Sequence, residues 1–589
     1  MINFLQLHCN CICKFNFLDL HRLKVIQKAI SKGKSLRRVE KETAIGQKRI
    51  FCIRKAEGEQ METSAEGIGR AVKDFYQQLY ASQVQVPFDP GGWTEECPDF
   101  MESELRSALS RMKTDKAPGE DGITVEMMNA SADRLLPLLT GMLNRYLNDG
   151  YIDDELVDSA TILLFKKGDP SLLKNYRPIS LLSSISKLFT RTICTRIEQT
   201  MEREQGDEQA GFRAGFSTTE HIMTLCELIE RTKEYPSSLY ICFVDFEKAF
   251  DSVERNSMWK ALESQGVHPK INRLLQNIYL QQRNTIILNN DQRVEVDVQR
   301  GVRQGDPISP ILFNAALEDI FRRLNWGRGG LSINGRPLTH LRFADDIIIV
   351  SRSLKELRRR LRELSTEAAR SGMKINEAKT EWMSNSTEIP LHPPMLNGKV
   401  LKKTESYVYL GRHISMPLDL KSEIRRRIRA GWLAYKKVDI YLTARHVPMK
   451  QKRMLFNQTI LPAMLYGCET WTATAEHLRM LRVAQRRIER RMAGTTLFDH
   501  MTNEHLRAIT GVKDLVVESH RRKRAFAWRI AQMDPERWCV QMMNWRPYGV
   551  KRPAGRPRTR WQDELRHSGA GANWLRGARE RTKSRWMTL

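Results

Sequence analysis

Three aspartates are the residues of this chain that are best suited to chemistry. Asp345 and Asp346 are adjacent and stand directly before the apolar run 347–350, while Asp245 closes a second apolar run, 239–244. Short β-rich apolar runs predict buried strands. If the two strands are neighbours in one sheet, the three carboxylates meet at one point. Their mutual repulsion then calls for a bound cation.

Such a cluster would suit the transfer of a nucleotide. This reaction uses two divalent cations about 4 Å apart, one to activate the attacking hydroxyl and one to hold the triphosphate. Mg²⁺ is a hard cation that prefers oxygen ligands and keeps several waters, so a few carboxylates suffice. Each part of the pattern is weak alone, because a pair of aspartates in a turn is usually only a solvated turn.

Two further segments add to the pattern. The stretch 300–313 contains Gly301 and Gly305, which would let the backbone approach a ligand closely, and Ser309-Pro310, which can begin a helix. Upstream, the segments 166–169 and 175–178 place cations on apolar flanks, as binding of a triphosphate requires. The plain alternatives are a turn before a helix and a basic surface hairpin.

The surrounding elements alternate between strand and helix patterns from about residue 94 to 415. The segment 285–298 predicts a hairpin that turns at 289–291, and Ser353 with Glu356 predicts a capped amphipathic helix that ends at Gly372. Residues 68–79 show helical spacing. Beyond Glu423 the pattern is helical and basic.

The overall charge points to a polyanionic partner. The chain has 589 residues and a formal net charge of +27, and a basic surface binds phosphates with release of counterions. An ordinary solvated basic surface is the alternative, and composition alone does not separate nucleic acid from an anionic membrane. No stretch reaches the roughly 18 apolar residues that a membrane span needs, so we expect no membrane-spanning segment.

Taken in order, these motifs resemble the reverse transcriptases of non-LTR (LINE-type) retrotransposons, most closely the RTE-like group. The matching segments are 116–123, 175–182, 207–213, 245–251, 301–313, 343–346, 372–380 and 409–411. The resemblance implies an α+β right-hand polymerase with fingers, a palm of antiparallel sheet and helices, and a helical thumb, followed by a basic, mostly helical C-terminal region. The expected domains are a linker-like helical extension (1–92), fingers and palm (93–415), a thumb-like region (416–515) and a basic Trp/Arg-rich nucleic-acid-binding tail (516–589).

The resemblance also implies roles for single residues. Asp245, Asp345 and Asp346 would be catalytic and would bind two Mg²⁺ ions, for which Mn²⁺ can substitute, with the carbonyl of Phe246 as a further ligand. The residues implied in substrate binding are Lys167, Arg177, Phe250, Gln304, Gly305 and Lys379.

The resemblance gives more specific roles to Phe250 and Lys379, and Asp251 lies next to Phe250 in the same motif. Phe250 falls at the steric gate that excludes a ribose 2′-hydroxyl, although it is also suited to simple core packing. Lys379, or alternatively Lys374, is expected near the leaving pyrophosphate. Asp251 has no implied chemistry and suits the N-cap of the next helix. Tyr409, Leu410 and Gly411 match the primer grip.

The tail combines tryptophan with arginine and lysine. Its segment 552–561 resembles an AT-hook, in which arginines lie in a narrow minor groove, and a generic basic tail or nuclear signal is the alternative. The residues expected to bind nucleic acid there are Arg552, Gly555, Arg556, Arg558 and Arg560. The tryptophans of the tail, interleaved with arginine, suggest stacking on single-stranded RNA.

The expected function is therefore RNA-directed DNA synthesis from a DNA primer on an RNA template, with deoxynucleoside triphosphates as substrates. The family implies chromosomal target DNA as a further partner and a nuclear location with a cytoplasmic ribonucleoprotein stage. Too few residues precede the fingers to hold the endonuclease that such elements carry, and no acidic set suggests an RNase H domain. Two alternatives stay open: a group II intron-type maturase, and an inert or domesticated remnant that only binds nucleic acid.

Overall fold

The computed structural model describes residues 50, 52–54, 61–89, 96–327, 329–387, 390–547, 549–555, 559–566, 571 and 573–588. By their internal contacts these residues form two compact units. The sheet unit comprises the described residues up to 218 and 238–404, and the helical unit comprises 219–237 and 405–588. Among the described residues, no helix is both long and apolar enough to cross a membrane. The fold is of the expected α+β class.

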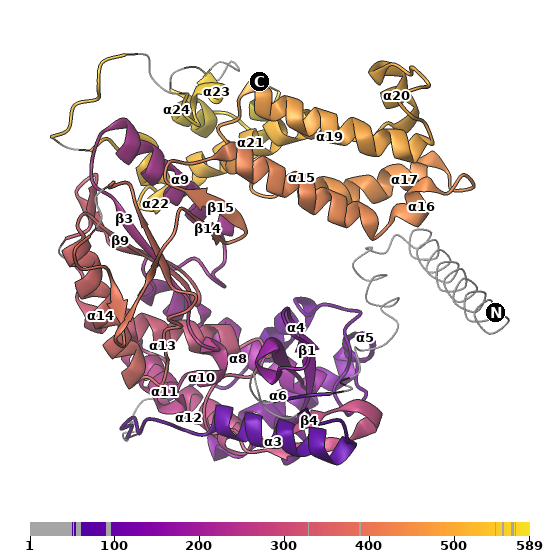
Figure 1. Cartoon of the computed structure of the whole chain (residues 1–589). Coiled ribbons are helices and arrows are strands. Elements are labelled where there is room, and N and C mark those ends of the chain that lie inside the picture. Colours follow the sequence, from indigo (N-terminus) through magenta and orange to yellow (C-terminus); the bar gives the residue numbers. More distant parts are fainter. Residues whose placement is uncertain are drawn as a thin grey trace. The chain divides into compact units, whose positions relative to one another are not determined.

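The main sheet of the sheet unit has the strand order β13-β10-β3-β9-β8; its central strands β3 and β9 are labelled in Figure 1. Its strands are β3 (Tyr240–Val244), β8 (His340–Phe343), β9 (Asp346–Ser351), β10 (Glu381–Ser384) and β13 (Lys402–Lys403). β3 and β9 are antiparallel neighbours, with Val244 opposite Ile347. Nearly every residue of these two strands is buried, so both faces of the sheet centre are covered. The two strands predicted from apolar runs are thus confirmed as neighbours.

Helix α14 (Leu354–Arg370) packs against β3 and β9 and begins at the predicted cap. The Ser353 hydroxyl accepts a hydrogen bond from the Glu356 amide at 3.2 Å. The Glu356 carboxylate accepts one from the amide of Arg352 at 3.1 Å, one residue ahead of the N-cap. Gly372 follows the helix with a φ of +79°, a left-handed conformation that glycine adopts without strain.

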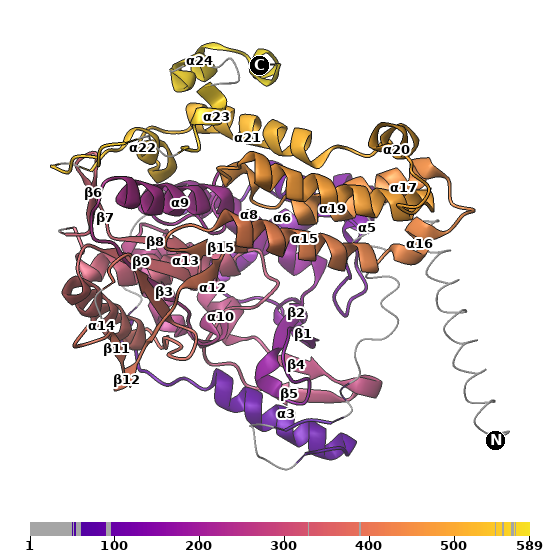
Figure 2. The same cartoon turned by 45° about the horizontal axis from the view of Figure 1, so that its top comes forward.

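The second sheet has the order β2-β1-β4-β5 and includes the predicted hairpin. Its strands are β1 (Ser159–Phe165), β2 (Tyr176–Leu181), β4 (Asn284–Ile287) and β5 (Arg293–Val296), with the 3-10 turns η1 (Leu173–Asn175) and η2 (Asn289–Asp291). Helix α3 (Ala65–Tyr80), which covers the predicted helical segment, packs on β5 (Figure 2). Residues 65–80 therefore belong to the same core as the sheet.

The remaining helices of the sheet unit enclose one large apolar core. They are α4 (Glu102–Ser110), α5 (Val125–Ala130), α6 (Ala132–Asp149), α7 (Asp154–Val157), α8 (Ser184–Glu204), α10 (Ala249–Ser252), α11 (Arg255–Ser264), α12 (Pro269–Leu280) and α13 (Ser309–Leu324). Short paired strands complete the unit: β6 (Leu331–Ile333) with β7 (Arg336–Leu338), and β11 (Met395–Leu396) with β12 (Lys399–Val400). α13 begins at Ser309-Pro310 as predicted.

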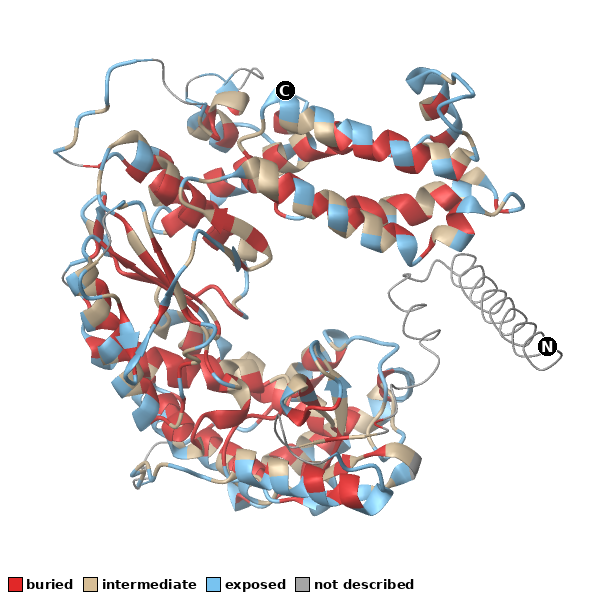
Figure 3. Ribbon diagram, in the orientation of Figure 1, coloured by how far each residue is buried: buried red, intermediate tan, exposed pale blue. Residues whose placement is uncertain are grey.

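The helical unit is built around α9 (Thr218–Glu234), α15 (Leu420–Lys436), α19 (Ala475–Ala493) and α21 (Leu515–Gln532). Its hairpin consists of β14 (Ser406–Tyr409) and β15 (Arg412–Ser415). The shorter helices are α16 (Asp439–Thr443), α17 (Met449–Leu455), the π-helical η3 (Phe456–Ile460), α18 (Leu461–Met464), η4 (Cys468–Thr470), α20 (Asn503–Thr510), α22 (Trp538–Asn544), α23 (Asp563–Leu565), α24 (Trp574–Glu580) and α25 (Lys583–Met587). α15 packs on α19, and both show buried and exposed residues in alternation (Figure 3).

Most of the tail tryptophans are buried, which contradicts a role of these residues in stacking on RNA. Five of them are at most 3% exposed: Trp538, Trp545, Trp561, Trp574 and Trp586. The Trp561 indole donates to the Glu469 carbonyl at 2.7 Å, and the Trp586 indole donates to the Arg524 carbonyl at 2.8 Å. Tryptophan supplies a large apolar surface with one polar group that needs a partner, and here it builds a core against α21.

Trp561→Ala should therefore act on stability. Removal of a buried indole ring costs about 3–5 kcal/mol through lost contacts and the cavity left behind, so the melting temperature of the full chain should fall. Trp528→Ala, at a half-buried position of α21, is the matched control and should cost less. A Trp561→Ala protein that melts like wild type but binds single-stranded RNA more weakly would contradict this explanation.

Candidate active site

The three aspartates lie at one end of the main sheet. β3 ends at Val244 opposite Ile347, so one further step along the same register places Asp245 beside Asp346. Asp345 lies in the tight turn between β8 and β9, where Phe343 pairs with Asp346. Ala344 completes this turn with a φ of +55°. A non-glycine residue in the left-handed region is uncommon and persists only where the surroundings hold it.

The electrostatics of this end of the sheet are those of a carboxylate cluster. The pKa of Asp346 is raised to about 6, first by desolvation of its carboxylate and then by repulsion from Asp345 and Asp245. The pKa of Asp345 is also raised, mainly by burial, with a further contribution from Asp245. The three carboxylates therefore interact electrostatically, as their positions in the sequence predict.

A lysine forms an ion pair with one of these carboxylates. The Lys379 ammonium lies 2.8 Å from a carboxylate oxygen of Asp245. The segment that carries it is bound to the chain after β3, because the Asn376 amide donates to the Asp245 carbonyl at 2.7 Å and the Glu247 amide donates to the Lys374 carbonyl at 2.9 Å. Lys379 was expected near a leaving pyrophosphate, and the structure instead places its ammonium against the carboxylate of Asp245.

The donor set fits hard divalent cations, since it offers carboxylate oxygens and little else. No group of three or more His, Cys, Asp or Glu side chains in the described part of the chain is already arranged around a common metal position. Repulsion among the carboxylates contributes to the raised pKa values of Asp345 and Asp346, and a cation bound among them would offset this repulsion. The carbonyl of Phe246 as a ligand stays a prediction.

Two cations lie close together in the fingers: Arg177 of β2 and Lys166, which directly follows β1. The role expected of Lys167 stays a prediction. Arg177 pairs with Leu164, and Lys166 follows two residues after Leu164, so both cations extend from the same face of the sheet. The pKa of Lys166 is lowered by burial and then by Arg177 and Lys379. Strand alternation, applied from Leu164 onward, was the signal that could have identified Lys166.

The loop with Gln304 and Gly305 is held between α10 and β2. A Cβ on Gly301, which has a φ of +85°, would lie 2.7 Å from the Asp251 carbonyl oxygen. A Cβ on Gly305, with a φ of +126°, would lie 2.8 Å from the Ser180 carbonyl oxygen. Both positions therefore require glycine for space as well as for backbone conformation.

Asp251 does not cap the next helix, contrary to expectation. It lies inside α10, and its carboxylate accepts a hydrogen bond from the Gln304 side-chain amide at 2.7 Å. The residue is 4% exposed, and burial raises the pKa of Asp251 to about 6. Lys248 is the positive charge that opposes this shift most strongly. Asp251 therefore links the first aspartate motif to the Gln304 loop.

Phe250 is the middle ring of three. It stacks on Phe313 with centroids 4.5 Å apart and meets Phe212 edge-on at 6.0 Å. Phe250 is half-buried, so one part packs in the core and another stays accessible. This arrangement is compatible with both roles considered for Phe250, and the gate stays a prediction.

The motif 409–411 belongs to the helical unit, whereas the aspartates belong to the sheet unit. Leu410 and Gly411 form the turn of the β14–β15 hairpin, with φ values of +43° and +77°. The Tyr466 hydroxyl donates to the Leu410 carbonyl at 2.8 Å, and Arg426 and Arg427 donate to the Gly411 carbonyl. The hairpin tip is therefore held by side chains of its own unit.

The AT-hook-like residues are only partly described. Arg556 and Arg558 lie outside the described residues. Arg560 forms an ion pair with Glu234 of α9, and Arg552 donates to the Gly555 carbonyl at 2.7 Å. Arg560 is thus already engaged within the helical unit, which leaves the predicted groove contact of this residue without support.

Comparison with known proteins identifies the domain. Residues 165–414 match the family model described as reverse transcriptase (RNA-dependent DNA polymerase). The chain is 33% identical over 247 residues to the putative uncharacterized transposon-derived protein F52C9.6 of Caenorhabditis elegans, which covers 40% of this chain and 87% of that protein.

Two longer relatives carry more specific names. The Pol polyprotein from the type-1 retrotransposable element R2 of Popillia japonica is 27% identical, covering 64% of this chain and 52% of that protein. The RNA-directed DNA polymerase from mobile element jockey of Drosophila funebris is 26% identical, covering 71% of this chain and 46% of that protein. The chain thus spans about half the length of these two relatives.

Among solved structures, apo telomerase from Candida tropicalis is similar at a TM-score of 0.35 and 12% identity, covering 72% of this chain and 73% of that chain. This similarity is too low to support an argument about the present chain.

The raised pKa of Asp251 predicts a pH-dependent stability. A carboxyl with a folded-state pKa of about 6 contributes stability while protonated, and this contribution is lost as the pH rises through the interval between its unfolded and folded pKa values, by about 3 kcal/mol at most. Asp251→Asn does not titrate, so its melting temperature relative to wild type should rise between about pH 4 and pH 7. Asp297→Asn, at an exposed position, is the control, and an equal pH profile for both variants would disprove the prediction.

Proposed function

The chain belongs to the reverse transcriptase family of non-LTR retrotransposons, and on this premise we propose that it extends a DNA primer on an RNA template. The family depends on divalent metal ions, and we propose Mg²⁺, with Mn²⁺ as a substitute, as the ions of this chain. The observation that carries the proposal is the placement of Asp245, Asp345 and Asp346 at one end of β3 and β9, with raised pKa values for Asp345 and Asp346.

The proposed mechanism assigns each group a task. Asp245, Asp345 and Asp346 would hold the metal ions, which when bound supply activation of the primer hydroxyl and neutralisation of the triphosphate. The Lys379 ammonium would compete with a bound cation for the same carboxylate oxygen of Asp245. A displaced ammonium would then be available to the phosphates of the incoming nucleotide, which reconciles its observed position with its expected role.

The nucleotide would lie between the aspartates and the fingers cations. Lys166 and Arg177 extend from one face of the second sheet and interact electrostatically with Asp345. Arginine suits bidentate contact with a phosphate, and lysine acts there as a point charge. Gln304 and Gly305 would line the pocket beside Phe250, whose ring would exclude a ribose 2′-hydroxyl.

The partners follow from the same proposal. They are an RNA template, a DNA primer, deoxynucleoside triphosphates and, for the complete element, chromosomal target DNA. This set would place the protein in the nucleus after a cytoplasmic ribonucleoprotein stage. The net charge of +27 supports binding to nucleic acid.

Primer extension tests the proposal directly. The full chain with Mg²⁺, oligo(dT) on poly(rA) and labelled dTTP should incorporate label, and Asp345→Asn should lower the rate by at least about 1,000-fold, because a metal ligand is lost. Asp133→Asn, whose side chain is 91% exposed, should extend primers like wild type. Binding of the primer–template by wild type without any extension would favour the inert remnant instead.

The assignment of Lys166 gives a second, separate test. Lys166→Ala should raise the KM for dTTP about tenfold, since one charge-assisted phosphate contact is removed, whereas Lys167→Ala should change it less. Steady-state extension at varied dTTP measures both. A larger effect at Lys167 would restore the original sequence-based assignment.

A further inference from the structure

The segment 206–213 runs beside the outer edge of the main sheet and reaches the turn that carries Asp345. Gln209 forms a parallel bridge with Arg342 of β8. The Ala210 amide donates to the Arg342 carbonyl at 3.0 Å, and the Arg342 amide donates to the Glu208 carbonyl at 2.7 Å. The segment thereby extends the sheet by a short stretch next to β8.

The side chain of Gln209 binds the catalytic turn itself. Its carboxamide oxygen accepts hydrogen bonds from the amide of Ala344 at 3.1 Å and from the amide of Gly211 at 2.8 Å. Gln209 is 1% exposed, so water does not compete for these bonds. Ala344 is the residue with positive φ that directly precedes Asp345.

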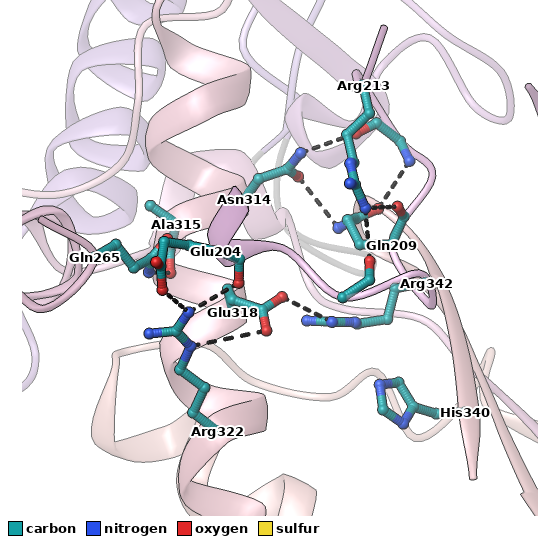
Figure 4. A network of polar contacts seen from close by, with 12 residues as sticks. Glu204, Gln209, Arg213, Gln265, Asn314, Ala315, Glu318, Arg322, His340 and Arg342 are labelled. Carbon is teal, nitrogen blue, oxygen red and sulfur yellow. Dashed lines mark hydrogen bonds and ion pairs between the residues drawn. The ribbon is translucent and has the colours of Figure 1, made fainter. Parts of the chain in front are cut away.

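A second amide fixes the orientation of the first (Figure 4). The Gln209 side-chain nitrogen donates to the Asn314 side-chain oxygen at 3.3 Å, and the Asn314 side-chain nitrogen donates to the Gly211 carbonyl at 2.8 Å. Asn314 is itself buried on α13. This exchange leaves the Gln209 oxygen, not its nitrogen, facing the two backbone amides.

The neighbouring side chains make the segment rigid. Arg213 donates to the carbonyls of Gly206 at 2.6 Å and Gln209 at 2.9 Å. Arg342, which is 2% exposed, forms an ion pair with Glu318 of α13 at 2.8 Å. Figure 4 shows two groups of contacts side by side, one around Gln209, Asn314 and Arg213 and one that includes Arg342 and Glu318.

Glycine is required where this segment meets the turn. A Cβ on Gly211 would lie 2.4 Å from the Ala344 nitrogen, a separation that no side chain can occupy. The segment and the turn are therefore packed backbone against backbone at Gly211, and the Gln209 side chain reaches the turn beside it.

We infer that Gln209 is a positioning residue that holds the Ala344 peptide in its left-handed conformation and so sets the carboxylates of Asp345 and Asp346 for metal binding. This inference rests on the proposed function. A turn with a non-glycine residue at positive φ relaxes unless its surroundings hold it. The Gln209 oxygen is the side-chain acceptor of the Ala344 amide, so removal of this oxygen leaves a buried donor unpaired and the turn free to shift.

Gln209→Met tests the inference, because methionine fills a similar volume without a strong acceptor. A small displacement of catalytic groups lowers turnover about 100-fold, so kcat for primer extension should fall by about that factor, while the KM for dTTP should change less than about threefold because the fingers cations are untouched. Binding of Mn²⁺, followed by the electron paramagnetic resonance signal of the free ion, should weaken about fivefold or more, because the carboxylates are no longer preset.

Gln265→Met is the matched control. Gln265 is also a buried glutamine packed against α13, and its amide donates to the Ala315 carbonyl at 2.9 Å. This variant should lose comparable thermal stability yet retain kcat and Mn²⁺ affinity. Asn314→Ala is the second test variant, for use where Gln209→Met does not fold, and should lower kcat and Mn²⁺ affinity in the same direction but less.

The outcomes distinguish the proposed function of the chain from the positioning role of Gln209. A wild-type protein that neither extends primers nor binds Mn²⁺ overturns the proposed function. An active wild type whose kcat and Mn²⁺ affinity are changed equally by the Gln209 and Gln265 substitutions overturns the role of Gln209 alone. Selective loss in Gln209→Met, with melting temperatures matched to Gln265→Met, supports it.

Discussion

The repulsion among three carboxylates at one end of a buried sheet is the constraint on which the rest of the sheet unit depends. Two adjacent strands, β3 and β9, bring Asp245 and the Asp345–Asp346 pair together. Asp245 and Asp345 are half-buried, so water screens their charges only in part. The raised pKa values of Asp345 and Asp346 record this cost. A fold that contains such a cluster must restrain the three side chains and must allow a cation to offset their charge.

The contacts that restrain the three aspartates come from elements far apart in the sequence. The segment 374–380 is hydrogen-bonded to the chain that follows β3, and Gln209 bonds the turn between β8 and β9. Asp251 ties α10 to the Gln304 loop. Each tie uses a buried or half-buried polar group with satisfied partners, so the site is restrained without any contribution from a bound ligand.

The positive charge near the aspartates comes from the exposed side chains of Lys379, Lys166 and Arg177. Lys379 reaches Asp245 through a long exposed side chain, and such a pair is weakened by solvent. A divalent ion binds carboxylate oxygens directly and would compete with the ammonium at this position. Lys166 and Arg177, on the neighbouring sheet, interact electrostatically with Asp345.

The sequence by itself determined the elements and the chemistry. The apolar runs before Asp245 and after Asp346, the hairpin at 289–291 and the cap at Ser353 are local signals, because strand burial, turn conformation and helix capping depend on neighbouring residues. The ordered motifs then indicated the family. The tertiary structure decided which residues face one another, since side-chain direction and partner choice depend on chain segments distant in sequence. In the tertiary structure Lys166, rather than Lys167, lies on the same face as Arg177. Asp251 lies inside a helix and bonds Gln304 instead of capping the next helix. Most of the tail tryptophans pack in a core, and the side chain of Gln209 bonds the turn that precedes Asp345.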